Sequence, residues 1–244
     1  MIRLLCCVVC WTLFAILAAV FGFASLYLTG SVDLLWRLSV WAGVAGYRLC
    51  GIRVRVVRQQ EIEDGRAYLF MSNHASNLDP PVITPLLGQR ISIIAKQELF
   101  KIPFFGRAMR AAGFVAVNRS NSRAALDSIR DAVGVLQSGR GMLVFPEGTR
   151  SPDGKLLPFK KGPFLLAMEA GVPVVPITIS GSHEAWPKGK MSLHPGEIVV
   201  HFHPPIDPRS FARKEDLLVA VRAAIHSALP EPYRDSAKAE PASR

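Results

Sequence analysis

The sequence predicts an α/β fold, a mixed sheet flanked by helices, with an N-terminal membrane-associated helical segment. Short β-rich runs alternate with helical patterns from Gly51 onward, and half of the 244 residues are hydrophobic. No charged side chain occurs between Arg3 and Asp33. Repeated strand and helix units are typical of layered α/β domains, and a chain of this length can bury one substantial core.

The order of the elements follows from the spacing of apolar residues. Strands are predicted at residues 52–57, 67–71, 91–95, 114–117, 142–145, 172–179 and 198–202. Helices are predicted at residues 80–87, 104–112, 122–137, 162–170 and 217–229. We divide the chain into a membrane-spanning or interfacial helical segment, a catalytic domain and a mobile tail, at residues 1–50, 51–229 and 230–244.

The uncharged run from Leu4 to Val32 is long enough to cross a bilayer, which takes about 20 apolar residues in a helix. Small residues within the run leave a cleaved signal peptide open as an alternative. The next run, residues 34–52, carries Arg37 and Arg48 on nearly the same helical face, among aromatic residues that favour the headgroup zone. We expect this helix to lie in the interface or to re-enter partway, and a helix packed on the soluble domain is the alternative.

Positive charge follows the apolar region directly. The formal net charge is +10, and Arg48, Arg53, Arg55 and Arg58 lie close together. Such charge marks the cytoplasmic side, so we expect the catalytic domain at the cytoplasmic face of a membrane, the bacterial inner membrane. No nucleic-acid-binding module is recognisable, so the basic balance favours an anionic membrane surface, phosphate and coenzyme A as partners and indicates no nucleic acid.

Cysteine and histidine usage indicates no metal site. Three cysteines lie in the apolar segment and Cys50 lies at its edge, which leaves the soluble part without a disulfide framework or a thiolate site. His201 and His203 alternate along a predicted strand, but no third ligand accompanies them.

His74 and Asp79 are the most informative pair of residues. A carboxylate on one ring nitrogen of a histidine fixes the tautomer and leaves the other nitrogen free to accept a proton. The pair therefore suggests base-assisted attack by a substrate hydroxyl. Because Pro80 follows, Asp79 also has the form of a helix N-cap, and this simpler role stays open.

A turn-rich segment, Phe-Pro-Glu-Gly-Thr-Arg-Ser, runs from Phe145 to Ser151. Such a turn exposes backbone N–H groups among hydroxyls and cations, which is typical of an oxyanion or phosphate pocket. Arg150, Lys160 and Lys161 can contact a phosphate, and a helix starting after Gly162 adds a favourable dipole. A solvated basic loop is the alternative.

Two further basic residues, Lys96 and Arg119, each follow a predicted strand. A guanidinium can bind a phosphate through two parallel hydrogen bonds, although an ordinary surface position is the alternative for both residues. Ligands in such sheets lie at the carboxyl ends of strands, where we place the loops at residues 72–79, 118–121 and 146–161.

Together these residues resemble the membrane glycerolipid acyltransferase family, which includes 1-acyl-sn-glycerol-3-phosphate acyltransferases. The resemblance covers roughly residues 67–178. Its four blocks are Asn73-His74 with Asp79, which matches the family's His-x4-Asp motif, then Gly113 to Arg119, Phe145 to Arg150, and Val172 to Ile177. In the second block, Asn118 stands where the family frequently has an aspartate.

The resemblance implies an O-acyltransferase of phospholipid biosynthesis. It would move a fatty acyl group from acyl-CoA or acyl-acyl carrier protein to the sn-2 hydroxyl of lysophosphatidic acid, giving phosphatidic acid without a cofactor. His74 would be the general base oriented by Asp79. The implied substrate-binding residues are Asn73, Lys96, Arg119, Glu147, Gly148, Thr149, Arg150 and Lys160. Acylation of another lysolipid, such as lyso-ornithine lipid or a lysophospholipid, and a catalytically inactive lipid-binding membrane protein are the alternatives.

Overall fold

Seven strands form one sheet in the described part of the chain. The structure is a computed structural model that describes residues 12, 16, 19–63, 65–117, 122–190 and 192–234, with the side chains of residues 122–126 left out. The strands are β1 (Ile52–Arg58), β2 (Leu69–Ser72), β3 (Ser92–Lys96), β4 (Val115–Val117), β5 (Met142–Val144), β6 (Val174–Ser180) and β7 (Gly196–Phe202). Their order across the sheet is β1-β7-β6-β2-β5-β3-β4.

The sheet is mixed because one strand pair reverses its direction. Strands β6, β2, β5, β3 and β4 pair in parallel, β7 runs antiparallel to β6, and β1 pairs in parallel with β7. The five parallel strands therefore end at one common edge. Strand β2 lies between β5 and β6, so the loop after β2 begins near the middle of that edge.

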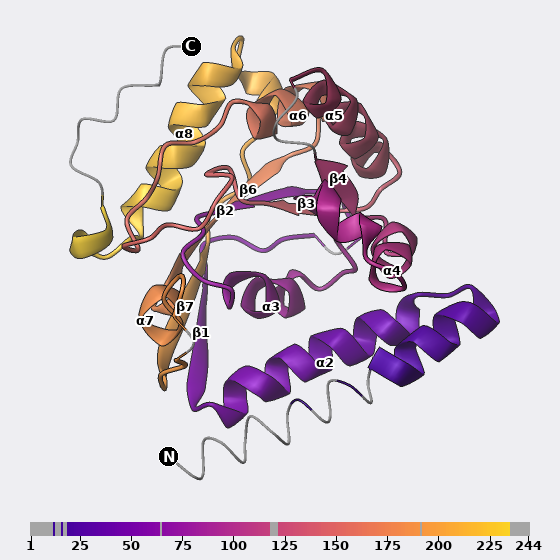
Figure 1. The fold of residues 1–244 in the computed structure, drawn as a ribbon. Coiled ribbons are helices and arrows are strands. Elements are labelled where there is room, and N and C mark those ends of the chain that lie inside the picture. Colours follow the sequence, from indigo (N-terminus) through magenta and orange to yellow (C-terminus); the bar gives the residue numbers. More distant parts are fainter. Residues whose placement is uncertain are drawn as a thin grey trace.

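Helices cover both faces of the sheet (Figure 1). The α-helices are α2 (Asp33–Leu49), α3 (Asp79–Ile83), α4 (Phe105–Ala111), α5 (Ser122–Gln137), α6 (Gly162–Ala170), α7 (Ser182–Ala185) and α8 (Lys214–Ser227). Short 3-10 turns are η1 (Thr84–Leu87), η2 (Gln97–Lys101), η3 (Pro208–Ser210) and η4 (Glu231–Tyr233). Figure 1 shows α5, α6 and α8 on one face and α2 and α3 on the other, which confirms the predicted mixed sheet flanked by helices.

Strand β2 connects the two halves of the core. Side chains alternate across a strand, so Leu69 and Met71 join the cluster under α6 and α8, while Phe70 joins the cluster over α3. All three are fully buried. Each contributes about 1.5–3 kcal/mol through removal of apolar surface from water, which fixes β2 and the start of the loop that follows it.

Helix α2 packs on the domain, as the alternative interpretation of residues 34–52 had it. It contacts α3 and β1, and it buries Ala42, Gly46 and Tyr47. A Cβ on Gly43 would lie 3.3 Å from the ring of Pro81 in α3, which shows how near the two helices approach. The outer face stays exposed and includes Trp41.

The apolar run before α2 is helical up to residue 29 in its described part, and this helix ends before α2 begins. Residues 19–29 are helical, and Gly30 then takes a φ of 72°, a left-handed conformation that ends the helix and reverses the chain into α2. Leu26 and Val32 pack against Ala108 and Ala112 at the end of α4. In the described ranges, no helix combines the length and the apolar character needed to cross a membrane. The described part thus does not support the predicted span, whose first half, including Cys6, Cys7 and Cys10, lies outside it.

The tail predicted from residue 230 begins with an ordered turn. The N–H of Leu156 donates to the carbonyl of Tyr233, 3.2 Å away, and Arg234 Nε donates to the carbonyl of Leu229 at 2.9 Å. Composition favours mobility here, but it does not show the bond to Leu156, which is distant in sequence. Residues 235–244 lie outside the described part.

His203 is buried where α8 crosses β6 and β7. Its Nε2 donates to Thr178 Oγ1 at 2.8 Å, and that hydroxyl donates to the carbonyl of Ile225 at 2.8 Å. The ring of His201 stacks on it with centroids 4.8 Å apart. Burial, with a smaller effect of His201, lowers the pKa of His203 from its ordinary 6.5 to about 4.

We expect His203→Gln to flatten the dependence of stability on pH. Between pH 6.5 and about 4, the unfolded chain binds a proton at His203 that the folded protein does not bind. The contribution of His203 to the free energy of unfolding of the wild type therefore falls by about 1.4 kcal/mol for each unit by which the pH is lowered in this window. Urea unfolding of both proteins at pH 7 and pH 5 measures the difference. Equal losses of stability in the two proteins would show that His203 does not titrate in this way.

Candidate active site

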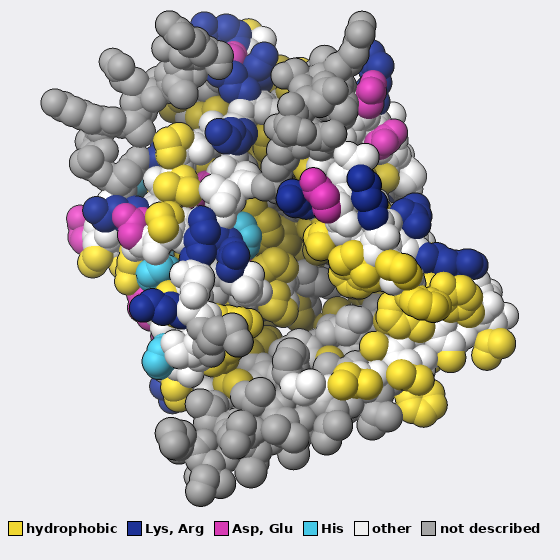
Figure 2. Space-filling view, in the orientation of Figure 1, with side chains coloured by type: hydrophobic (Ala, Val, Ile, Leu, Met, Phe, Trp, Pro, Cys, Tyr) yellow, Lys and Arg dark blue, Asp and Glu magenta, His cyan; other side chains and the backbone are white. Residues whose placement is uncertain are grey.

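Three loops that follow parallel strands meet at the carboxyl edge of the sheet. The N–H of Ser151, in the loop after β5, donates to the carbonyl of His74 in the loop after β2, at 2.7 Å. Ser76 Oγ donates to the carbonyl of Trp186, which ends α7 after β6, at 2.9 Å. In Figure 2 the middle of this side of the molecule is hollowed, with both hydrophobic and basic side chains around the hollow.

His74 and Asp79 form the centre of this site. His74 Nδ1 lies 2.7 Å from Asp79 Oδ2, and the same oxygen accepts the N–H groups of Ala75 and Ser76 at 2.7 and 2.8 Å. The side chain of Asp79 is fully buried, whereas 17% of the His74 side chain is exposed. Three donors on one oxygen stabilise the carboxylate, so Nδ1 carries the ring proton and Nε2 remains as the acceptor for a substrate proton.

Asp79 is not an N-cap. Helix α3 begins at Asp79, Leu78 occupies the N-cap position, and no side chain there accepts a helix N–H. The carboxylate of Asp79 bonds backward to the loop that holds His74. Pro80 fits the first turn because its fixed φ suits a helix start, so the local sequence places Asp79 for its bond to His74.

The ring of Phe145 connects His74 to an apolar cavity. It stacks on the His74 ring with centroids 4.1 Å apart and an interplanar angle of 23°. Phe145 also lines a cavity of about 420 Å³ with Gly148 and Lys160. The apolar residues that complete its wall are Ile94, Val117, Ile129, Val144, Pro146, Pro163 and Leu166. A hydrophobic chain can thus lie beside the candidate base.

Glu147 is a structural tie within the site. Its Oε1 accepts the N–H of His74 at 2.7 Å, and its Oε2 accepts the N–H of Leu157 at 2.9 Å. Only 2% of the residue is exposed. The geometry therefore differs from the expected substrate contact, because the side chain lies inside the protein with both oxygens engaged.

Burial also changes the acidity of Glu147. Loss of water raises its pKa from 4.5 to about 8, and the nearby charge of Asp79 acts in the same direction. The two backbone N–H groups oppose that rise. Since one of these groups belongs to His74, Glu147 fixes the position of the backbone that carries the candidate base.

Asn73 also differs from its expected role in substrate binding. Its Nδ2 donates to the carbonyl of Ile179 at 2.9 Å, and its Oδ1 accepts the N–H of Ile179 at 2.8 Å. The side-chain amide donates and accepts as a peptide group of a neighbouring strand would, so it continues the pairing of β2 with β6 just beyond the end of β2. Only 3% of Asn73 is exposed, so it holds the loop rather than a ligand.

The turn at Gly148 is tight, as its sequence predicts. The N–H of Gly148 donates to the carbonyl of Phe145 at 3.0 Å, and Gly148 takes a φ of 72° that favours glycine. Its own N–H therefore serves the turn. Beyond it, Thr149 is exposed and Arg150 is partly exposed, where a ligand can reach them.

Sequence reasoning missed Lys188. Its Nζ donates to the carbonyl of Arg150 at 2.7 Å and lies 3.5 Å from Thr149 Oγ1. Lys188 thus joins the basic side of the site from the loop after α7. The only local signal in the sequence is that Lys188 lies between a proline and a glycine, which indicates a turn. Helix α7 has four residues, which is too few for a periodic pattern to predict it.

The remaining basic residues are placed less closely around the dyad. Lys160 is exposed at the cavity lined by Phe145. Lys96 is exposed at the end of β3, where its Nζ lies 3.6 Å from Glu98 Oε1. Arg119, the expected phosphate ligand, lies outside the described residues, as does Asn118. Among the side chains that the structure describes, no three of the metal-ligating types cluster closely enough to hold an ion.

The fold and the site place a histidine, held by a buried aspartate, next to an apolar cavity, an arrangement that suits an enzyme acting on a hydroxyl. The chain belongs to the acyltransferase family, whose sequence profile matches residues 53–180. This confirms the resemblance found in the motifs.

Several relatives carry the name of one enzyme. The chain is 37% identical over 181 residues to a chloroplastic 1-acyl-sn-glycerol-3-phosphate acyltransferase of Brassica napus, an alignment that covers 73% of this chain and 51% of the relative. It is 29% identical over 199 residues to the enzyme of that name in Escherichia coli, with 80% of each chain covered. The chain spans about half the length of several plant relatives it matches.

A solved structure extends the likeness to three dimensions. The 1-acyl-sn-glycerophosphate (LPA) acyltransferase PlsC from Thermotoga maritima superimposes with a TM-score of 0.76 at 30% sequence identity. The alignment covers 92% of this chain and 93% of that chain. The shared fold therefore extends beyond the residues that the family profile matches.

Proposed function

We propose that this protein transfers a fatty acyl group from acyl-CoA or acyl-acyl carrier protein to the sn-2 hydroxyl of lysophosphatidic acid, giving phosphatidic acid. The observation that carries the proposal is the His74–Asp79 pair at 2.7 Å, next to an apolar cavity. The named activities of the relatives in Escherichia coli and Thermotoga maritima support the choice of acceptor.

In the proposed reaction, His74 Nε2 takes the proton of the acceptor hydroxyl as its oxygen attacks the thioester carbonyl carbon. A C–O bond forms, the C–S bond breaks, and the imidazolium returns the proton to the leaving thiolate. Asp79 stabilises the positive ring because its carboxylate is buried and bonded to Nδ1. The reaction needs no bound cofactor, and the protein itself forms no covalent bond to the acyl group.

The basic side of the site suits the phosphate of the acceptor. Arg150 and Lys160 flank the turn at Gly148, and Lys188 reaches the same turn from the loop after α7. Binding energy from a remote phosphate orients the hydroxyl toward Nε2, which is the most effective use of such contacts. We assign Arg119 and Lys96 to the same headgroup region.

We further propose that the enzyme works at an anionic membrane surface on its cytoplasmic side. Leu28, Phe104 and Phe105 are exposed near the turn between the first helical segment and α2, and Trp41 is exposed along α2. Figure 2 shows hydrophobic side chains gathered at the right of the molecule, over the helices labelled α2 and α4 in Figure 1. Contiguous exposed apolar surface with aromatic rings suits the lipid interface.

One assay tests the acceptor and the activity together. The purified protein is given a common acyl-CoA donor with lysophosphatidic acid, lyso-ornithine lipid or lysophosphatidylcholine in mixed micelles, and diacyl product is measured. We expect turnover chiefly with lysophosphatidic acid. A preference for another lysolipid would show that lysophosphatidic acid is not the acceptor. No product with any of them, or with acyl-acyl carrier protein as donor, would favour an inactive lipid-binding protein.

We expect Arg119→Ala to raise the KM for lysophosphatidic acid by about 10- to 100-fold, because a charge-assisted phosphate contact contributes about 1.5–3 kcal/mol. The value of kcat should change less than KM, since we assign Arg119 to the phosphate of the acceptor and not to its reacting hydroxyl. Steady-state kinetics with varied acceptor measure both constants, and Arg130→Ala on the exposed part of α5 is the control. An unchanged KM would remove the phosphate role.

A further inference from the structure

The C-terminal turn η4 touches the two loops that hold His74. Tyr233 lies in this turn, and its phenol donates to Glu184 in α7. Its carbonyl accepts the N–H of Leu156 in the loop after β5, at 3.2 Å. A single residue near the end of the chain thus bridges elements that follow β5 and β6.

The first route from this turn runs through the loop after β5. Leu156 is held by Tyr233, and the next residue, Leu157, donates its N–H to Glu147 Oε2 at 2.9 Å. Glu147 Oε1 then accepts the N–H of His74 at 2.7 Å. Arg222 of α8 supports the same stretch by donating to the carbonyl of Leu157 at 2.8 Å. Three hydrogen bonds and the peptide bond between Leu156 and Leu157 make up this route, so we expect a shift of these two residues to move the backbone of His74.

The second route runs through α7. Glu184 accepts the phenol of Tyr233, and α7 is followed by Trp186, whose carbonyl accepts Ser76 Oγ at 2.9 Å. The N–H of Ser76 in turn donates to Asp79 Oδ2 at 2.8 Å. This route reaches the aspartate, whereas the first route reaches the histidine.

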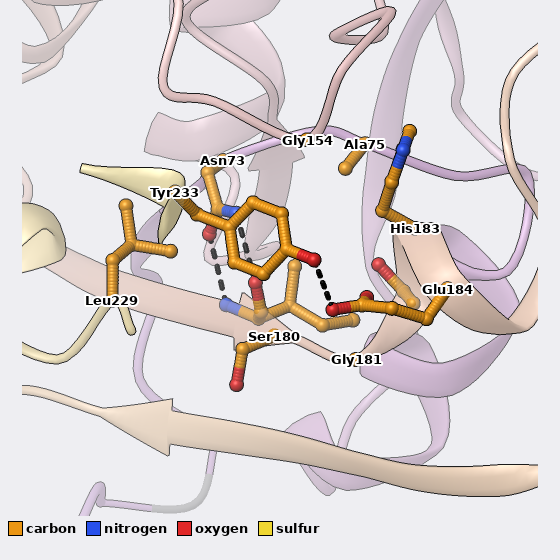
Figure 3. A pocket seen from close by; sticks show the side chains of 11 residues that line it. Asn73, Ala75, Gly154, Ser180, Gly181, His183, Glu184, Leu229 and Tyr233 are labelled. Atoms are coloured by element: carbon orange, nitrogen blue, oxygen red, sulfur yellow. Dashed lines mark hydrogen bonds between the residues drawn. The ribbon is translucent and has the colours of Figure 1, made fainter. Parts of the chain in front are cut away.

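Packing around the ring makes the arrangement specific. A Cβ on Gly154 would lie 2.7 Å from the ring of Tyr233, so only glycine leaves room for the ring there. Figure 3 shows the ring between Leu229 and Glu184, over a cavity that Asn73 and His183 also line. The cavity measures about 10 Å³ and leaves room for about one water molecule.

We propose that η4 is a latch in which Tyr233 positions His74 and Asp79 for acyl transfer through the loops after β5 and β6. Tyr233 touches neither residue and acts only through the others, so it is a positioning residue. The hydrogen bond to Glu184 raises the pKa of Tyr233 to about 12, and the phenol therefore stays protonated throughout the working pH range. The inference rests on the proposed function for its kinetic readout only.

The test compares two shortened chains. The control chain ends at Arg234 and keeps the turn, and the test chain ends at Pro230 and lacks it. We expect the control to match the full chain. In the test chain kcat should fall by about 10- to 100-fold, as a misplaced base predicts, while the KM for lysophosphatidic acid changes less than about 2-fold. The pH profile of kcat should shift as well, because the surroundings of the imidazole change.

A purely structural role would lower the amount of folded enzyme and leave the pH profile of the remaining activity unchanged, and that result would overturn the proposal. If the shorter chain does not fold, Tyr233→Phe and Glu184→Ala replace it, since each removes one hydrogen bond. Each should lower kcat by about 2- to 5-fold, and the double variant should lower it no further because the two share one bond. Wild-type kcat in both single variants would contradict the latch.

A readout without substrate separates the latch from the proposed function. In NMR spectra of histidine-labelled protein at one fixed pH, the His74 signal is identified by its loss in His74→Ala. We expect the ring chemical shifts of His74 to differ between the test chain and the control chain. Unchanged shifts contradict the latch, whereas failure of the full chain to acylate any lysolipid contradicts the proposed function alone.

Discussion

His74→Ala is expected to lower kcat by about 10²–10⁴-fold, because it removes the group that takes the hydroxyl proton. The KM values for donor and acceptor should change little, since the basic residues and the apolar cavity remain. Acyl transfer by the purified variant, followed with a labelled donor, measures the effect. Near-UV circular dichroism checks that the fold is kept, because Asp79 retains its bonds from Ala75 and Ser76.

The matched control is His194→Ala. His194 is an exposed histidine, and the one hydrogen bond described for its side chain joins Nε2 to Ser192 Oγ at 3.2 Å. The His194→Ala variant should retain full activity. If His74→Ala keeps activity within a few-fold of wild type, the general-base mechanism is wrong and the attacking hydroxyl must lose its proton elsewhere.

Glu147→Ala is expected to have the second largest effect. It leaves the N–H groups of His74 and Leu157 without their acceptor, at about 1–3 kcal/mol for each buried group, so the free energy of unfolding should fall by about 2–6 kcal/mol. The backbone of His74 loses a support, and kcat should fall by about 100-fold. Urea unfolding and steady-state kinetics measure the two effects. Glu169→Ala, at an exposed position in α6, is the control, and equal behaviour of the two variants would contradict the role of Glu147.

Glu147→Gln separates charge from hydrogen bonding. Between pH 4.5 and about 8 the folded protein binds a proton at Glu147 that the unfolded chain has lost. Stability from this group is therefore lost as pH rises through that window, by about 1.4 kcal/mol per unit. Glutamine does not titrate, so the variant should lack this part of the decline between pH 6.5 and 8. Parallel stability curves for the two proteins would show that Glu147 is ionised throughout.

The sequence predicts the parts of the site that depend on short separations. His74 and Asp79 are five residues apart, and one loop with a helix start brings them together. Strands and helices alternate along the chain, so the spacing of apolar residues locates most of them. Two of the three predicted loops, at residues 72–79 and 146–161, meet at the site because parallel strands of such a sheet end at one edge, whereas residues 118–121 lie outside the described part.

Partners distant in the chain could not be predicted in this way. Asn73 bonds to Ile179, 106 residues later, and His74 bonds to Glu147, 73 residues later. A motif shows that such residues belong to the site, but burial decides whether they touch a ligand or hold a loop. For the same reason the role of Tyr233 could not be predicted, since the sequence around it indicates only a proline-containing tail.

The N-terminal segment shows a different limit. Hydropathy measures how apolar a run is, and it does not show that Leu26 and Val32 pack against Ala108 and Ala112. Helix α2 buries one face against α3 and β1, while Trp41 stays exposed on the other face. A helix with two such faces suits a boundary between protein and lipid as well as a protein surface, so sequence alone left both interpretations open.

The central position of β2 has a consequence for how the protein is made. Both neighbours of β2 in the sheet, β5 and β6, come much later in the chain, and the loop at His74 is fixed by Glu147 after β5 and by Ile179 within β6. During synthesis from the amino terminus, β2 therefore waits for its partners. A nascent chain that ends before β6 cannot fix the catalytic loop, so the ribosome must release most of the domain before any acyl transfer begins.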